Sequence, residues 1–204
     1  MSQRPIMDAG PGINFLSVNK ERLLFSTLGA LSVPEAVETE ILRKAAQDKR
    51  FSAAERVWKR LPERLMKVLS DDVTDELSAA VQRISGVPFD QRVRSGKDLG
   101  ETMVIAHASV AAEVGAHVIV LIDDGGGCRA AAREARRLQR LQANGNSVGS
   151  IALIHTVTVL ERAAGSEHLP DKNAMQDLYG RLRALDDGLP PLAATGLMAL
   201  PCWQ

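Results

Sequence analysis

The chain has 204 residues, of which 45% are hydrophobic and 25% charged, and its formal net charge at neutral pH is zero. This length suits one α/β domain, and the apolar fraction excludes an intrinsically disordered chain. A zero net charge excludes the strongly basic surface of a protein that coats nucleic acid, but it is compatible with a nuclease whose acidic pocket offsets a basic rim.

The chain also lacks the signals of membrane insertion and secretion. No stretch approaches the roughly 18 consecutive apolar residues of a membrane-spanning helix. The N-terminal segment has no apolar core of the length found in secretion signals. The two cysteines, Cys128 and Cys202, are far apart and belong to no metal-binding motif. We therefore expect a cytoplasmic protein with no membrane partner.

Short strands separated by helices are expected in the first half of the chain. Residues 5–7 form a short apolar step that ends at Asp8, and residues 9–12 have the composition of a turn. The patterns that follow predict a helix over 14–27 with a break near Asn19, a strand at 31–33, a helix beginning at Pro34, an edge strand at 65–69, a helix at 72–84 and a loop at 86–97.

The second half contains the clearest strand. Residues 117–122 are a continuous apolar run, which is typical of a strand buried on both faces of a parallel sheet. Asp123 and Asp124 end this strand, and Gly125–Gly127 reads as a turn. Helices are predicted at 99–113, 129–142, 149–163 and 172–185. Strands separated by helices imply βαβ units and hence an α/β fold.

Carboxylates occur where open parallel sheets bind ligands, beyond the carboxyl ends of the strands. Asp8 ends the first strand and Asp123 and Asp124 end the apolar one, while Glu40 and Glu101 lie in predicted helices. If the two strands are neighbours, these groups can converge. Clustered carboxylates raise one another's pKa, and Mg²⁺ or Mn²⁺ removes that repulsion. A metal-bound water can then attack a phosphodiester.

Each acid also has an ordinary structural interpretation. Asp8 could be a turn residue, Glu40 a solvated charge, and Glu101 an acid that complements a helix dipole. Either Asp123 or Asp124 could cap the helix that follows.

An Arg-rich helix follows the apolar strand. By spacing, Arg133, Arg136, Arg137 and Arg140 share a face, which fits either a solvated surface or phosphate contacts beside the pocket. The glycines Gly125–Gly127 lack the spacings of a phosphate-binding loop.

Five segments occur in an order that carries a family resemblance. They are the strand ending in Asp8, SVPEAVETEIL with Glu40 (residues 32–42), DLGETMVIAHA with Glu101 (98–108), VLIDDGGGCRAAAREA with Asp123 and Asp124 (120–135), and SVGSI with Ser150 (147–151). In this order they resemble the PIN-domain family, in particular its VapC-like branch and the subgroup with Gly-Glu and Asp-Asp motifs.

The resemblance implies a PIN-like, Rossmann-like three-layer α/β/α sandwich with a central parallel sheet and an extra C-terminal helix. It implies endoribonuclease activity, commonly that of the toxin in a toxin–antitoxin pair. The expected catalytic residues are Asp8, Glu40, Glu101, Asp123 and Asp124, and all of these except Glu40 are expected to hold Mg²⁺ or Mn²⁺. RNA, a cognate antitoxin and a second copy of the chain are the expected partners.

Further contacts to a phosphate or to the pocket are expected from Ser150, Arg129 and Arg133. Ser150 stands where the family has Thr, and Ala9–Pro11 replaces a common Ser/Thr.

We expect one PIN-like domain over residues 1–204, with a helical elaboration at 47–97 that is atypical of the family and a C-terminal helix and tail at 170–204. These departures leave open a degenerate PIN domain that acts as a protein or RNA interaction module. Another Mg²⁺-dependent phosphohydrolase is disfavoured, because no Asp-x-Asp follows the first strand.

Overall fold

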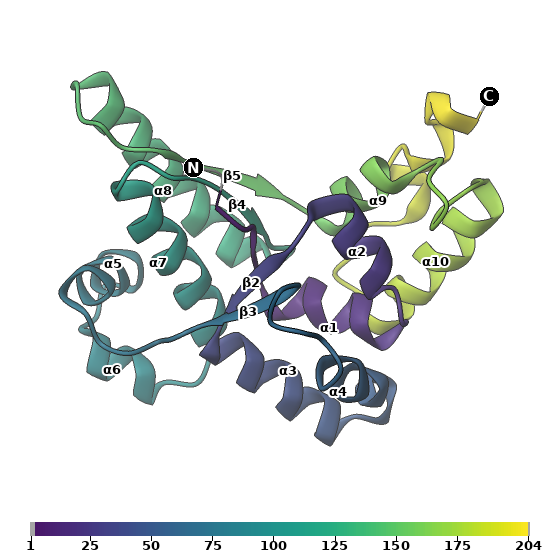
Figure 1. Cartoon of the computed structure of the whole chain (residues 1–204), viewed down its shortest axis with the longest axis horizontal. Helices are drawn as coiled ribbons and strands as arrows, with labels where there is room; N and C mark the ends of the chain where they lie inside the picture. The colour runs from purple at the N-terminus through teal and green to yellow at the C-terminus, as the bar shows by residue number, and fades with distance from the viewer. Residues whose placement is uncertain (1–2, 204) are drawn as a thin grey trace.

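A five-stranded, all-parallel sheet forms the centre of the protein, as the computed structural model shows for residues 3–203 (Figure 1). The strand order is β3-β2-β1-β4-β5. The strands are β1 (Ile6–Met7), β2 (Leu31–Pro34), β3 (Met66–Leu69), β4 (His117–Leu121) and β5 (Ser150–Ile154). The predicted α/β class with a central parallel sheet is therefore confirmed.

Helices connect the strands and continue beyond the last of them. The α-helices are α1 (Ala9–Ser17), α2 (Glu21–Leu28), α3 (Glu35–Gln47), α4 (Ser52–Trp58), α5 (Asp75–Ser85), α6 (Phe89–Arg94), α7 (Leu99–Glu113), α8 (Gly125–Ala143), α9 (Thr156–Ala163) and α10 (Lys172–Leu185). Short 3-10 turns are η1 (Lys49–Phe51), η2 (Leu192–Ala194), η3 (Leu197–Ala199) and η4 (Pro201–Trp203).

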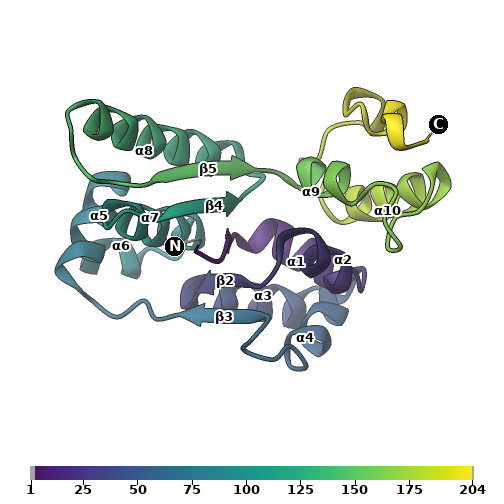
Figure 2. The same ribbon diagram turned by 45° about the horizontal axis from the view of Figure 1, so that its top comes forward.

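The helices form two layers around the sheet. The chain crosses the sheet in one direction from β1 to β3 and in the other from β3 to β5. Because such crossovers are right-handed, the connecting helices of the two halves cover opposite faces. Helix α7 packs against four of the strands, and α8 runs alongside β5, while α3 and α4 lie near β3 (Figure 2). This is the predicted three-layer α/β/α sandwich.

Strand β4 lies inside the sheet, as its apolar run predicts. Val118, Val120 and Leu121 are buried, as is Ile122 just after the strand, while Ile119 is partly buried. Helices on both faces explain why successive side chains are covered rather than alternate ones.

The first helical segment differs from its prediction at one end. Residues 9–12, predicted as a turn, form the first turn of α1, where Pro11 is tolerated because its missing N–H has no partner to lose. The predicted break near Asn19 is confirmed: Asn19 has φ +54° and separates α1 from α2.

Two other predictions were wrong. Residues 149–163 are not one helix but β5 followed by α9, because pairing with β4 provides residues 150–154 with backbone hydrogen-bond partners. The predicted loop at 86–97 contains α6, in which the buried Arg92 donates to the carbonyl oxygens of Ser95 and Lys97 at 2.8 and 2.7 Å.

The C-terminal segment packs beside the first two helices (Figure 1). Helix α10 has the predicted bounds of residues 172–185. Asn14 Nδ2 in α1 donates to Asp186 Oδ2 at 2.9 Å, and Arg181 donates to the carbonyl oxygen of Val18 at 2.9 Å. Within residues 3–203, no helix has the length and apolar character needed to cross a bilayer.

Candidate functional site

The candidate site lies at the carboxyl ends of β1 and β4, which are neighbours in the sheet. The backbone N–H of Asp8, directly after β1, donates to the carbonyl oxygen of Leu121 at the end of β4, at 2.9 Å. From these two strands the chain continues to opposite sides of the sheet. Open α/β sheets bind ligands at such a switch point, because the connections diverge there and leave a crevice.

A pocket of about 720 Å³ lies at this edge and carries an excess of acids. Its acidic lining residues are Asp8, Glu35, Glu40, Asp71, Asp98, Glu101 and Asp124. Its cationic lining residues are Arg43, Lys44 and Lys97. Four of the five predicted catalytic acids therefore line one pocket, and Asp123 is the exception.

Asp8 is the most deeply buried of these acids and also begins a helix. It is the N-cap of α1, and its Oδ2 accepts from the N–H of Gly10 at 3.4 Å. Only 6% of its surface is exposed. Burial, with a smaller contribution from the nearby Glu40, raises the pKa of Asp8 to about 6, against the opposing effect of the helix N–H groups.

Glu40 lies close to Asp8, across the backbone of Gly100. A Cβ atom at Gly100 would lie 3.0 Å from Glu40 Oε2 and 3.9 Å from Asp8 Oδ1. Glycine therefore lets the start of α7 approach both carboxylates. Lys44 Nζ, one helical turn after Glu40, pairs with Glu40 Oε1 at 2.7 Å and supplies a positive charge to this side of the pocket.

Glu101 and Asp124 form a second pair of acids. Burial, together with the negative charges of Asp124 and Asp8, raises the pKa of Glu101 to about 8. The N–H groups of Gly127 and Gly126 hold the pKa of Asp124 below its usual value. The raised pKa of Glu101 and the lowered pKa of Asp124 therefore favour the proton on Glu101 near neutral pH, with Asp124 ionised.

The glycines after Asp124 belong to a helix rather than to the predicted turn. Asp124 caps α8, and its Oδ1 accepts from the N–H of Gly126 at 2.5 Å and from that of Gly127 at 3.1 Å. A Cβ at Gly127 would lie 2.2 Å from Ile122 Cδ1 and 3.1 Å from Glu101 Oε2. The absent side chain at Gly127 therefore makes room for the Glu101 carboxylate.

Asp123 faces another part of the protein. Its Oδ1 accepts from the N–H of Thr156 at 2.8 Å, and its Oδ2 accepts from Thr156 Oγ1 at 2.6 Å. Burial raises the pKa of Asp123, although the two Thr156 hydrogen bonds oppose the shift. The carboxylate joins the end of β4 to the start of α9, so the structure does not bring Asp123 to the pocket as a metal ligand.

Three further predicted contact residues have different positions. Ser150 begins β5 and lies 2.9 Å from His117 Nδ1 at the opposite edge of the sheet, so its predicted contact with the pocket is wrong. Arg133 is exposed on α8 and does not line the pocket. Arg129 is one turn nearer, and its positive charge contributes to the lowered pKa of Asp124.

The prediction overlooked Lys44, Asp71 and Thr156. Lys44 had a signal, because it lies four residues after Glu40 in a helix. Asp71 follows the end of β3 and accepts from the N–H of Ala36 at 2.8 Å, so the rule that identified Asp8 would have identified it. Thr156 was hidden by the wrong helix at 149–163.

The donor chemistry of the pocket fits a hard, hydrated cation. Over residues 3–203, no set of three or more His, Cys, Asp or Glu side chains is arranged closely enough to hold a metal ion on its own. The pocket acids instead form two pairs, Asp8 with Glu40 and Glu101 with Asp124. Mg²⁺ commonly retains several waters and uses only one or two carboxylates, so oxygen ligands around an open pocket suit it or Mn²⁺.

The resemblance to PIN domains is one of sequence motifs. The chain matches no protein-family model, no curated protein and no solved structure.

Proposed function

We propose that the protein is a metal-dependent endoribonuclease that hydrolyses RNA phosphodiesters in the acidic pocket. The observation that carries this proposal is the convergence of Asp8, Glu40, Glu101 and Asp124 on one pocket at the carboxyl edge of the sheet. These acids come from four segments far apart in the sequence, and burial raises the pKa of two of them. Such concentrated, desolvated carboxylates are typical of functional sites.

Asp8, Glu101 and Asp124 are the residues that would hold a hydrated Mg²⁺ or Mn²⁺, in part through its water ligands, with Glu40 beside them. When bound, the ion would offset the repulsion of the carboxylates, polarise the phosphate and activate water. The Glu101–Asp124 pair holds one proton at the pocket, and loss of that proton would make a second negative charge available. Lys44 orients the Glu40 carboxylate through their 2.7 Å ion pair.

The more specific role is that of a cytoplasmic toxin paired with an antitoxin, and it depends on the resemblance to VapC-like PIN domains. A homodimer belongs to the same proposal. The sequence motifs support an antitoxin and a second copy of the chain as partners. The chemistry of the pocket bears only on the RNA substrate.

A second candidate is a degenerate PIN domain that binds a partner without catalysis. One observation favours it: Asp8 and Asp124 both cap helices, a role that requires no metal. Their presence could therefore reflect stability alone.

Cleavage of a mixed RNA pool in Mn²⁺ or Mg²⁺, with an EDTA control, tests the proposal. We expect cleavage only with the ion, and we expect Asp8→Asn to reduce it by at least about 100-fold, because the neutral amide lacks the charge that the cation requires. Glu161→Gln is the matched control, since it removes an exposed carboxylate on α9 outside the pocket.

Cleavage that persists in EDTA or in the Asp8→Asn protein would exclude the metal mechanism. If the intact protein does not cleave RNA, calorimetric titration with Mn²⁺ separates the two candidates. A selective enzyme should still bind the ion, whereas a degenerate pocket should not.

A further inference from the structure

Four arginines form a single row on the outer face of α8, which we call the α8 arginine stripe: Arg129, Arg133, Arg136 and Arg140. All four are exposed, and their spacing of four, three and four residues places them on one side of the helix. The opposite side is buried through Gly127, Ala131, Glu134 and Leu138. Arg137, which the sequence grouped with this face, is not part of the stripe.

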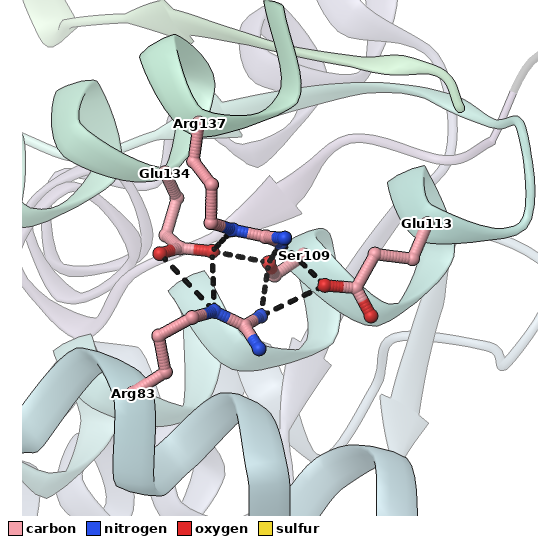
Figure 3. Close-up of polar contacts among 5 residues, drawn as sticks. All are labelled: Arg83, Ser109, Glu113, Glu134 and Arg137. Atoms are coloured by element: carbon pink, nitrogen blue, oxygen red, sulfur yellow. Dashed lines mark hydrogen bonds and ion pairs between the residues drawn. The ribbon is translucent and has the colours of Figure 1, made fainter. Parts of the chain in front are cut away.

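The stripe is not neutralised by acids of its own helix. Glu134 is the one acid in α8, and it points inward, where it accepts from Ser109 Oγ at 2.7 Å and from Arg137 Nε at 2.9 Å (Figure 3). Arg83 on α5 also pairs with Glu134, at 3.2 Å. In the part of the chain that the structure describes, no arginine of the stripe forms an ion pair.

The stripe begins at the acidic pocket and leads away from it. Arg129 lies beside the start of α8, with its Nη1 3.3 Å from the position that a Cβ of Gly125 would occupy. Asp124, which caps the same helix end, lines the pocket. At the far end, Arg136 and Arg140 line a shallow hollow of about 350 Å³. From Arg129 to Arg140 the stripe is about 16 Å long at the rise of an α-helix.

We propose that the α8 arginine stripe binds the phosphates of single-stranded RNA that extends out of the pocket. The inference rests on the proposed function, because it takes the pocket as the position of the scissile phosphodiester. A single row of exposed guanidinium groups, none of them in an ion pair, complements one polyanionic backbone, and arginine suits phosphate through its planar, multidentate donors. The stripe therefore positions substrate without reading bases, since phosphate contacts carry no direct sequence information.

The test measures binding of a labelled mixed-sequence RNA in EDTA, so that cleavage does not interfere. The variant is Arg133→Gln/Arg136→Gln/Arg140→Gln, which leaves Arg129 beside the pocket intact. The control, Arg60→Gln/Arg64→Gln/Arg162→Gln, removes the same charge from exposed positions elsewhere. We expect the stripe variant to weaken binding about tenfold or more and to lower the slope of log affinity against log salt by about 2, because three phosphate contacts are lost.

Lengthening the RNA from a dinucleotide to a strand that spans α8 should strengthen binding to the intact protein but not to the stripe variant. A thermal melt like that of the intact protein shows that the variant is folded. Equal losses in the stripe variant and the control would overturn the inference, because they would reflect net charge alone. Equally tight, stripe-dependent binding of poly-glutamate would also overturn it, in favour of an acidic protein partner.

The Mn²⁺ cleavage assay separates this inference from the proposed function. Cleavage of RNA by the intact protein with undiminished binding by the stripe variant would refute the stripe alone. Stripe-dependent RNA binding with neither cleavage nor calorimetric Mn²⁺ binding would refute the nuclease and retain α8 as an RNA-binding surface.

Discussion

Asp8 and Asp124 both cap helices and line the pocket, yet their carboxyl groups have opposite pKa shifts. Asp8 is buried, so desolvation outweighs its hydrogen bonds from the helix and raises the pKa to about 6. Asp124 is exposed, so the N–H groups of α8 dominate and lower the pKa. The same capping role thus leaves one carboxyl able to hold a proton in mild acid and the other ionised.

Glu101→Gln should change how stability depends on pH. A carboxyl whose folded pKa is raised to about 8 stabilises the fold at low pH, and that contribution is lost as pH rises from its ordinary value of 4.5 through 8. Glutamine remains neutral at every pH. In EDTA, we therefore expect the variant to melt at a higher temperature than the intact protein above pH 8, and at a similar temperature near pH 4.5.

Thermal melts across this pH range are the measurement. Exposed Glu161 provides the control, because Glu161→Gln should follow the intact protein at every pH. Parallel curves for Glu101→Gln and the intact protein would show that Glu101 is not desolvated as the structure indicates.

At the scale of elements, the first turn of α8 accepts only glycine at Gly127. An added methyl would meet Ile122 Cδ1 at 2.2 Å, so we expect Gly127→Ala to destabilise the fold by about 1–3 kcal/mol, as overpacking does. Removing that Cδ1 with Ile122→Val should restore part of the loss in the double variant. Gly125→Ala is the matched control, since its methyl would meet only the flexible end of Arg129.

Urea unfolding of the single and double variants measures this coupling. Additive effects of Gly127→Ala and Ile122→Val would contradict the proposed steric conflict.

Elements whose hydrophobic pattern fits only a strand or only a helix were predictable from the sequence. The apolar run 117–122 fits a buried strand, and residues 172–185 fit an amphipathic helix, so β4 and α10 agree with their predictions. The local pattern of residues 149–163 fits either a strand or a helix. Residues 150–154 form a strand because they pair with β4. The family resemblance placed the expected hydroxyl contact at Ser150, whereas the hydroxyl that donates to a predicted acid belongs to Thr156.

For the site, sequence reasoning identified the acids that follow strands but not which way they face. Asp123 and Asp124 are adjacent, and no local pattern indicates that one bonds Thr156 while the other lines the pocket. The contact of Glu40 with Asp8 also depends on how α3 and α7 pack around Gly100, which is a tertiary property.

Across the whole molecule, α7 and α8 connect the acidic pocket to a partly buried ion-pair network around the buried Glu134. Near its start α7 carries Glu101, and further along it Ser109 and Glu113 bond Arg83 and Arg137 (Figure 3). Burial alone would raise the pKa of Glu134, but Ser109 and the two arginines outweigh it and lower the pKa. This network therefore stabilises the fold above the ordinary pKa of Glu134, and the contribution is lost as pH falls through the depressed value.

The ion-pair network and the pocket acids make the stability of the metal-free protein depend on pH in opposite directions. The Glu134 network weakens in acid, whereas the pocket acids Asp8 and Glu101 destabilise the fold as pH rises through about 6 and about 8. Mn²⁺ should oppose only the second effect, because protons and the ion compete for the same carboxylates. We therefore expect Mn²⁺ to raise the melting temperature strongly above pH 8 and little below pH 6.

The expected gain is about 2.7 kcal/mol at an ion concentration 100 times the dissociation constant, provided that the unfolded chain does not bind the ion. Melts with Mn²⁺ or EDTA at each pH measure it, and Asp8→Asn should abolish the gain while Glu161→Gln keeps it. A gain of equal size at every pH, or one that survives in Asp8→Asn, would place the ion elsewhere. The loss of melting temperature at low pH should be the same in all of these melts, because Glu134 lies in the network of Arg83 and Arg137 rather than in the pocket.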